Sequence, residues 1–303
     1  MTTDTPTAFA PGDIVVASSD VDDRNVDLRN HAGPGRLLHM DAGFALRASL
    51  HTGTTGLVIG VAVDPASGML YAADAQAYTL VAFDAAGRGP MVQDWLPRRR
   101  FGAILPVDGG LWLGVHSRLG PPPEDHWGQK WLFHGNPETG EVRAFDVEID
   151  GGMRGFHCVT HFALEPDGHT LRYVSEGGRR VMRFDLLSHR QLEDFLRLDA
   201  DDPRGTCGIA TLGDGGMLLA TGKGCCRYDA RGVRVEDYDV PVEPGWSRVT
   251  LASDGRHFFL NNFFSGVVEV RRVDGGAVVR RHDIGRKYSL CGLVEYPARA
   301  ATQ

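Results

Sequence analysis

The chain has 303 residues, of which 42% are hydrophobic and 23% charged, and this ordinary globular composition excludes a disordered, collagen-like or coiled-coil protein. Its formal net charge of −7 at pH 7 argues against a nucleic-acid backbone as the main partner. The 39 glycines and 16 prolines are spread along the chain, so they favour many short strands joined by tight turns over helices.

The first residues, MTTDTPTAFAPG, lack the basic start and the apolar stretch of a signal peptide. The apolar runs are too short for a transmembrane helix. Five cysteines, an odd number without a repeated C-x-x-C, are not typical of a secreted disulfide framework. We therefore expect a cytoplasmic protein with reduced thiols and no membrane partner.

A phrase recurs along the chain, made of a small residue, alternating apolar residues, a turn with glycine and a second apolar strand. Its copies are IGVAVDPASGMLYAAD from Ile59, FGAILPVDGGLWLGVH from Phe101, THFALEPDGHTLRYVSE from Thr160, CGIATLGDGGMLLATG from Cys207, SRVTLASDGRHFFLNN from Ser247 and, in part, CGLVEYP from Cys291. The leading positions, which are 42, 59, 47, 40 and 44 residues apart, are Gly60, Gly102, His161, Gly208, Arg248 and Gly292.

Four short strands in roughly 40–50 residues are typical of one blade of a β-propeller. Five copies carry their own first strand, and the sixth is split between GDIVVASS near the N-terminus and CGLVEYP at the C-terminus. Pairing of these two strands would close the ring and remove exposed sheet edges. The sequence predicts an all-β protein, a single six-bladed propeller domain over residues 1–303, with an ordered core of about 12–298.

The long interval between two copies indicates an insertion, HSRLGPPPEDHWGQKW, between the second and third strands of its blade. Three prolines and two tryptophans make this a stiff, amphipathic loop. We expect residues 117–130 to lie over the mouth of the central channel, since long loops in compact domains are often functional.

The pattern G-[VIL]-A-[VT]-x-D-x-x-G-x-L-[YW] resembles the NHL-repeat propellers and the related senescence-marker/gluconolactonase family. The resemblance covers nearly the whole chain and implies the six-bladed fold. Gluconolactonase-type members are hydrolases with a metal in the central channel, so the resemblance also implies a hydrolase with one divalent cation (Ca, Mg, Mn or Zn) and no organic cofactor. The family's Glu, Asn and Asp ligand motifs are not matched here, because no G-E-G-P occurs and no Asn or Asp precedes a leading position.

The first strand of each blade is expected to line the channel, where glycine at the leading position would leave it open. His161 and Arg248 replace that glycine in two blades, so their side chains should project toward the axis. Arginine suits a carboxylate or phosphate, and histidine can exchange a proton or bind a metal. Cys207 is a further catalytic candidate if a neighbouring cation lowers its pKa, although cysteines at such positions are more often buried hydrophobes. We expect substrate contacts from Phe101, Trp246, Thr160, Cys291 and Tyr288.

The second strands should end near the same mouth, where they offer Asp74, His116, Glu176 and Asn262, with Ser19 and Asp20 on the split blade. His116 is a candidate catalytic residue, and Glu176, Asn262 and Asp74 are candidate metal ligands. An acid, an imidazole and an amide from separate blades could hold a divalent ion or act as an acid–base pair. Taken alone, a residue of these types at such a position is more often a turn or strand-end hydrogen-bonding residue.

Two functions remain open at this point. The first is a small-molecule enzyme, a hydrolase such as a lactonase or esterase, or a metal-free lyase in which Arg248 anchors an anionic substrate and His161 is the general base. The second is a non-catalytic propeller that binds a ligand or protein. The basic runs RRR at 98–100 and RKY at 286–288 are interpreted as solvated surface, and the oligomeric state stays open.

Overall fold

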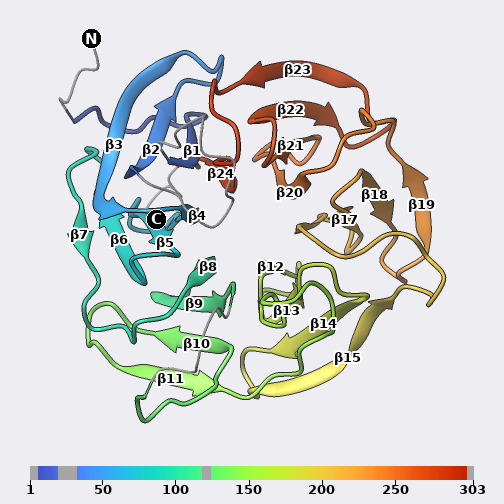
Figure 1. The fold of residues 1–303 in the computed structure, drawn as a ribbon, viewed down its shortest axis with the longest axis horizontal. Helices are drawn as coiled ribbons and strands as arrows, with labels where there is room; N and C mark the ends of the chain where they lie inside the picture. The colour runs from blue at the N-terminus through green and yellow to red at the C-terminus, as the bar shows by residue number, and fades with distance from the viewer. Residues whose placement is uncertain (1–5, 20–32, 118–123, 299–303) are drawn as a thin grey trace.

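The structure, a computed structural model, describes residues 6–19, 33–117 and 124–298. Within these ranges the chain forms twenty-four strands and no helix. The strands make six four-stranded antiparallel sheets, which stand as blades around a ring with the first strand of each blade nearest the centre (Figure 1). The predicted six-bladed propeller is confirmed.

Five blades are continuous in sequence. Blade 1 consists of β4 (Val58–Val63), β5 (Leu70–Asp74), β6 (Thr79–Phe83) and β7 (Met91–Val92). Blade 2 consists of β8 (Phe101–Val107), β9 (Gly110–Val115), β10 (Leu132–Gly135) and β11 (Val142–Phe145). Blade 3 consists of β12 (His161–Leu164), β13 (Thr170–Val174), β14 (Arg180–Asp185) and β15 (Arg190–Arg197). Blade 4 consists of β16 (Ile209–Thr211), β17 (Met217–Ala220), β18 (Cys225–Tyr228) and β19 (Arg234–Asp237). Blade 5 consists of β20 (Trp246–Leu251), β21 (His257–Asn262), β22 (Val267–Arg272) and β23 (Val278–Asp283).

Blade 6 joins the two ends of the chain. Its strands, from the centre outward, are β24 (Gly292–Glu295), β1 (Ile14–Ser19), β2 (Pro34–Met40) and β3 (Leu46–Thr55). β1 pairs with β24 in an antiparallel register that sets Ile14 opposite Glu295 and Ala17 opposite Gly292. The predicted closure of the ring is therefore confirmed, and it pairs β1 on both sides, with β24 and with β2.

Six apolar clusters, one between each pair of neighbouring blades, form the core of the described residues. Inner strands are covered on both faces, so every residue of β5 is buried and the strand reads as a continuous apolar run. The outermost strand β23 has one open edge and is mostly exposed. Burial thus decreases from the inner to the outer strands of a blade, and this explains why the first two strands of each repeat have the clearest apolar pattern in the sequence.

The leading glycines allow the inner strands to approach one another. A Cβ atom at Gly60 would lie 2.5 Å from the carbonyl oxygen of Gly102, and one at Gly208 would lie 2.6 Å from the Cα atom of Arg248. The interpretation that the leading glycines keep the channel open is wrong, because the space beside each of them is occupied. The neighbouring blade fills it at Gly60 and Gly208, and the side chains of His116 and Arg248 fill it at Gly102 and Gly292. Glycine is needed for this close backbone contact.

The insertion lies between β9 and β10, as expected, and residues 118–123 of it fall outside the described residues. Its described part is tied to the loop before β8 by Asp125, whose carboxylate accepts two hydrogen bonds from Arg99, at 2.7 and 2.8 Å. Arg99 is only 5% exposed. The interpretation of RRR at 98–100 as solvated surface is therefore wrong for Arg99, whose charge is paired and buried under the insertion.

In the part of the chain that is described, no helix is long and apolar enough to cross a membrane.

Candidate functional site

His116 stands directly after β9, at the end of the second strand of blade 2. Its backbone N–H donates to the Arg100 carbonyl oxygen at 2.8 Å, which fixes the residue beside the start of β8. The imidazole fills the space over Gly102, where a Cβ atom would lie 2.5 Å from the Cβ atom of His116. Gly102 has no side chain, and this leaves room for the His116 imidazole.

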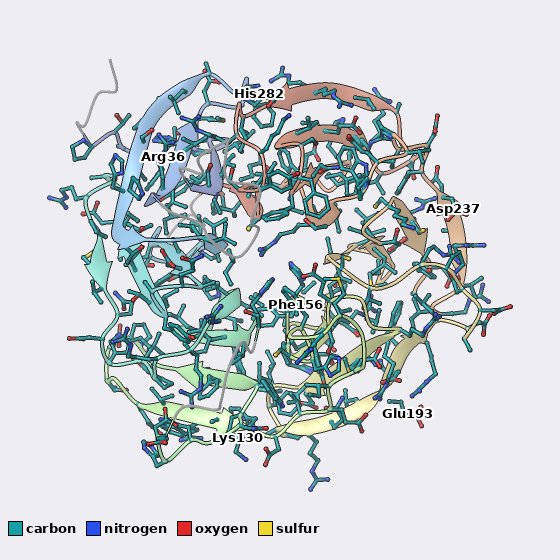
Figure 2. All side chains as sticks on the ribbon, viewed as in Figure 1. Arg36, Lys130, Phe156, Glu193, Asp237 and His282 are labelled. Carbon is teal, nitrogen blue, oxygen red and sulfur yellow. The ribbon has the colours of Figure 1, made fainter. Side chains whose placement is uncertain are left out.

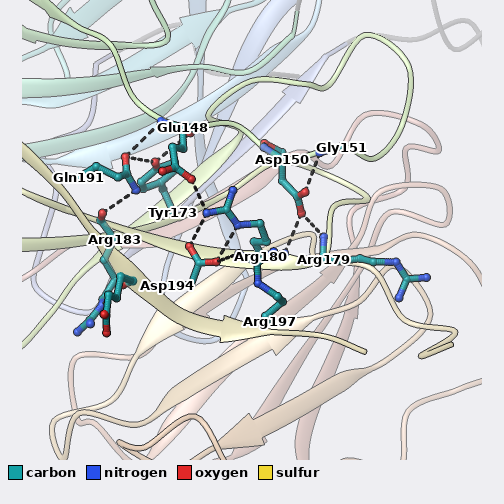
Figure 3. Close-up of polar contacts among 12 residues, drawn as sticks. Glu148, Asp150, Gly151, Tyr173, Arg179, Arg180, Arg183, Gln191, Asp194 and Arg197 are labelled. Atoms are coloured by element: carbon teal, nitrogen blue, oxygen red, sulfur yellow. Dashed lines mark hydrogen bonds and ion pairs between the residues drawn. The ribbon is translucent and has the colours of Figure 1, made fainter. Parts of the chain in front are cut away.

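Glu176 occupies the corresponding place in blade 3, in the turn after β13. Asp150 holds this turn, because its carboxylate accepts the backbone N–H groups of Arg179 and of Arg180, the latter at 2.8 Å (Figure 3). The Asp150 N–H in turn donates to Ser175 Oγ at 3.0 Å. The same network ties the loop between β11 and β12 to blade 3, so the turn that carries Glu176 is fixed from both sides.

His116 and Glu176 face each other across two blades. His116 Nε2 lies 3.7 Å from Glu176 Oε2, and their side chains are 15% and 18% exposed. Burial raises the pKa of Glu176 to about 7. Burial, together with the positive charges of Arg248 and Arg100, lowers the pKa of His116 to about 3. At neutral pH the histidine is therefore uncharged, while the carboxyl group is close to half-ionised.

His161, the first residue of β12, lies next to this pair. Its ring centroid is 5.7 Å from that of His116, with the two planes at 80°. Burial lowers the pKa of His161 well below its usual value, and the charges of Arg248 and His116 act in the same direction. Its Nδ1 is buried and has no hydrogen-bond partner among the described residues. His161 is therefore neutral, with one ring nitrogen available.

Arg248 reaches the same centre because of an irregularity in blade 5. The pairing of β20 with β21 shifts register between Trp246 and Arg248, so these two residues do not share a face as they would in a regular strand. Trp246 points into the core, and Arg248 extends over Gly292, where a Cβ atom would lie 2.8 Å from Arg248 Nη1. That Nη1 donates to the Ile59 carbonyl oxygen at 3.1 Å.

The Arg248 guanidinium has no carboxylate partner among the described residues. Burial lowers its pKa to about 10, with only the Cys291 thiol acting in the other direction. An arginine that is half-buried and lacks a counter-charge is costly to the fold unless another anion binds to it. Among the residues that the structure describes, Arg248 is thus the strongest candidate for an anion-binding group.

Two thiols complete the centre. Burial is the largest cause that raises the pKa of Cys207 and of Cys291, and the negative charge of Glu176 also raises both. Arg248 lowers the pKa of Cys291 without overcoming burial. Both thiols are therefore protonated at neutral pH, which does not favour a nucleophilic role for Cys207. We call His116, His161, Glu176, Cys207, Arg248 and Cys291 the axial cluster.

The other residues expected to contact a substrate lie elsewhere. Phe101 is 2% exposed and packs against Phe133 between blades 1 and 2. Trp246 is fully buried between blades 4 and 5, and its indole N–H donates to the Pro241 carbonyl oxygen at 3.0 Å. The Thr160 hydroxyl donates to the Val174 carbonyl oxygen at 3.0 Å inside blade 3. Tyr288, half-buried, packs against Phe264 in blade 5, at a centroid distance of 5.6 Å.

The three candidate metal ligands are not brought together. Asp74 Oδ1 accepts the N–H groups of Gln76 and Ala77, and its Oδ2 accepts the Thr54 hydroxyl at 2.6 Å. Asn262 Oδ1 accepts two backbone N–H groups of its own turn, at 2.9 and 3.0 Å. Among the described residues no group of three or more His, Cys, Asp or Glu side chains is arranged to hold a metal ion. The donor set therefore does not fit the expected cation. Asp20 and the side chain of Ser19 lie outside the described residues.

Two residues at this centre were not predicted. Phe156, in the loop before β12, packs its ring against His116 at a centroid distance of 5.3 Å and lies near the middle of the ring of blades (Figure 2). Arg100 is one of the positive charges that lower the pKa of His116. Phe156 carries no sequence signal, since it stands in a loop outside the repeat. Arg100 could have been found from its position directly before the first strand of blade 2.

Comparison with models of known families and with curated protein sequences gives no match. Solved structures with the same fold include a nidogen/laminin complex (11% identity, TM-score 0.64), aligned over 93% of this chain and 97% of that chain. The chain is a six-bladed β-propeller. A gluconolactonase from Xanthomonas campestris is also similar, at 17% identity and TM-score 0.57, over 75% of both chains. A streptogramin B lyase aligns at 11% identity and TM-score 0.57, over 93% of this chain and 91% of that chain. At these identities the likeness concerns the fold alone.

Proposed function

We propose that this propeller is a metal-independent acid–base enzyme of the lyase class, acting at the axial cluster on a small substrate that carries a carboxylate. The observation that carries the proposal is the pairing of Glu176, whose pKa lies at about 7, with an arginine that has no counter-charge among the described residues. A general base is most effective when its pKa is near the working pH. Perturbed titratable groups gathered from several elements are typical of active sites.

The proposal places Glu176 and Arg248 around one substrate. Arg248 lowers and Glu176 raises the pKa of the Cys291 thiol, so the charges of both groups act on the same residue. Arg248 would hold the substrate carboxylate through paired N–H donors. Glu176 would then face the carbon atom next to that carboxylate.

The reaction is an elimination. The ionised Glu176 carboxylate accepts a proton from the carbon next to the substrate carboxylate, a carbon–carbon double bond forms, and the bond to the leaving group on the next carbon breaks. Glu176 then returns its proton to the leaving oxygen or nitrogen. Arg248 stabilises the negative charge that gathers on the carboxylate during proton removal. The neutral His116 and His161 contribute hydrogen-bonding nitrogen atoms without adding a positive charge that would lower the pKa of Glu176.

A hydrolase is the second candidate, because one observation favours it. Glu176 is 18% exposed, so a water molecule can reach its carboxylate and be activated by it. The fold likeness to a gluconolactonase is compatible with this alternative. Hydrolysis and elimination differ in whether solvent oxygen enters the product.

The test is turnover of a panel of carboxylates with a leaving group on the second carbon, beside the matching amides and a set of lactones, in 18O-labelled water. The proposal predicts unsaturated products without 18O from the carboxylates and none from the amides. Glu176→Gln should lower kcat/KM by about 10²–10⁴. The matched control is Glu193→Gln, on the outer strand β15 at the rim of the ring (Figure 2), which should leave turnover unchanged. Products containing 18O would instead support the hydrolase, and full activity of Glu176→Gln would overturn both.

A further inference from the structure

A pocket of about 290 Å³ lies between blades 2 and 3, away from the axial cluster. It is lined by the hairpin after β8 at Val107 and Asp108 and by the hairpin after β12 at Gly168 and His169. β8 and β12 begin at the axial cluster and run to these hairpins, so the pocket opens at the opposite end of the strands. It is therefore independent of the proposed active site.

An aromatic wall forms the inner side of this pocket. Trp112, on β9, is 4% exposed, and its ring lies 4.7 Å from that of His134, with 36° between the planes. His189 is 6.2 Å from Trp112 on the blade 3 side. His134 can lie against β9 only because Gly110 has no side chain, since a Cβ atom there would be 2.3 Å from His134 Nε2. Phe145 also packs against Trp112, at a centroid distance of 5.2 Å, so the rings open to a planar ligand are those of the half-buried His134 and the exposed His189.

The polar groups around the wall carry little unmatched charge. Arg143 is paired with Glu141, its Nη2 donating to Oε1 at 3.0 Å. Burial and the neighbouring Arg143 lower the pKa of His134, so that imidazole is neutral at pH 7. Asp108 is exposed to solvent at the rim. A neutral ligand therefore fits this lining better than a strongly charged one.

One ring nitrogen in the pocket wall lacks a partner. His169 Nδ1 is buried and makes no hydrogen bond in the described part of the chain. The nearest carboxylate oxygen, Asp167 Oδ2, is 3.7 Å away and already accepts the Thr170 hydroxyl at 2.6 Å. The rest of the His169 side chain is 40% exposed, so a ligand in the pocket would reach the outer edge of this ring.

Leu187 gives the pocket an apolar lip, since 72% of this leucine is exposed at the turn after β14. The volume lies just below the usual range for ligand pockets, roughly 300–1,000 Å³, which suits a molecule of one or two rings. We propose that this pocket binds a small, uncharged, planar heteroaromatic molecule, which stacks on the His134 and His189 rings next to Trp112 and exchanges a hydrogen bond with His169.

The test follows the indole N–H cross-peaks of the five tryptophans in a 1H–15N spectrum of the full chain. Trp112→Phe assigns the Trp112 peak by its loss. The probes are adenine as a neutral heteroaromatic, benzoate as an anionic aromatic and cyclohexanol as a non-aromatic ring. We expect adenine to shift the Trp112 peak saturably and more strongly than the other two probes do.

His169→Leu should raise the dissociation constant for adenine at least tenfold, whereas Glu176→Gln should leave it unchanged. If Trp112→Phe does not fold, His169→Leu still provides the comparison, because its change lies at the rim. The proposal is overturned if adenine moves no indole peak, if cyclohexanol or benzoate binds as tightly, or if His169→Leu has no effect.

Discussion

Glu176 Oε2 lies 3.7 Å from His116 Nε2, although the two residues end the second strands of different blades. The distance is slightly longer than a hydrogen bond, so a small movement or one water molecule would join them. Burial drives both groups toward their neutral forms, which raises the pKa of Glu176 and lowers that of His116. This opposition makes Glu176 the group that titrates near neutral pH.

Glu176→Gln should stabilise the fold above pH 7. The folded pKa of about 7 lies above the ordinary 4.5, so the native state holds a proton that the unfolded state has lost, and stability falls as pH rises between these values. The full cost above pH 7 is at most about 3 kcal/mol. Urea unfolding at pH 4 and pH 8 measures it. We expect equal stability of variant and wild type at pH 4 and a clear gain at pH 8, and an equal difference at both pH values would contradict the assignment.

Arg248→Met should separate stability from substrate binding. Removing a desolvated charge without a carboxylate partner is expected to raise the free energy of unfolding by about 1 kcal/mol. The same change should raise KM for a carboxylate substrate at least tenfold, because the anchor is lost. Thermal unfolding and steady-state kinetics measure the two effects. A destabilised variant with unchanged KM would show that Arg248 has a structural role only.

Gly102→Ala should displace His116. The new Cβ atom would lie 2.5 Å from the Cβ atom of His116, which cannot swing away because it is attached directly to the backbone. We expect a loss of about 1–3 kcal/mol in stability and a lower kcat/KM. Gly213→Ala is the matched control, because nothing lies within 4 Å of its new Cβ atom. Equal behaviour of the two variants would show that the space over Gly102 is not needed.

The cysteines should react slowly in the folded protein. All five are free thiols, and burial raises the pKa of Cys207, Cys225, Cys226 and Cys291. With a thiol-specific chromogenic reagent at pH 8, we expect slow labelling of the native chain and five thiols after denaturation. Rapid labelling of one thiol, abolished by substitution of Cys207 or Cys291, would revive covalent catalysis at the axial cluster.

The fold could be predicted from the sequence because the inner strands of every blade pack against the neighbouring blades, and this packing requires the same apolar pattern in each repeat. Inner strands are buried on both faces, so each copy keeps its apolar strands, and Gly60 and Gly208 stand where neighbouring backbones meet. The split blade followed from the same pattern, since β24 and β1 each lack the partner that the other supplies. The reason for the glycines did not follow, because the distance between blades is not recorded in a single strand.

The candidate site could be predicted only in part. Repeat-equivalent positions led to His161, Arg248, His116 and Glu176, which the structure places together. Trp246 was expected to contact the substrate, but it is buried in the core. The register shift between Trp246 and Arg248 breaks the regular alternation of side chains along β20, so the two residues do not point the same way. Asp74 and Asn262 have the residue types of metal ligands, yet their oxygens are used by backbone N–H groups of their own turns, and no spacing rule separates the two uses.

The most direct test of the central claim is a pH titration of the Glu176 carboxyl carbon in protein labelled with 13C at the glutamate side-chain carboxyl, with Glu176→Gln to assign its signal. The account predicts a single titration near pH 7, while exposed glutamates titrate near their usual values. A midpoint for Glu176 near 4.5 would contradict the account, because the carboxylate would then be an ordinary solvated group with no reason to act as the general base.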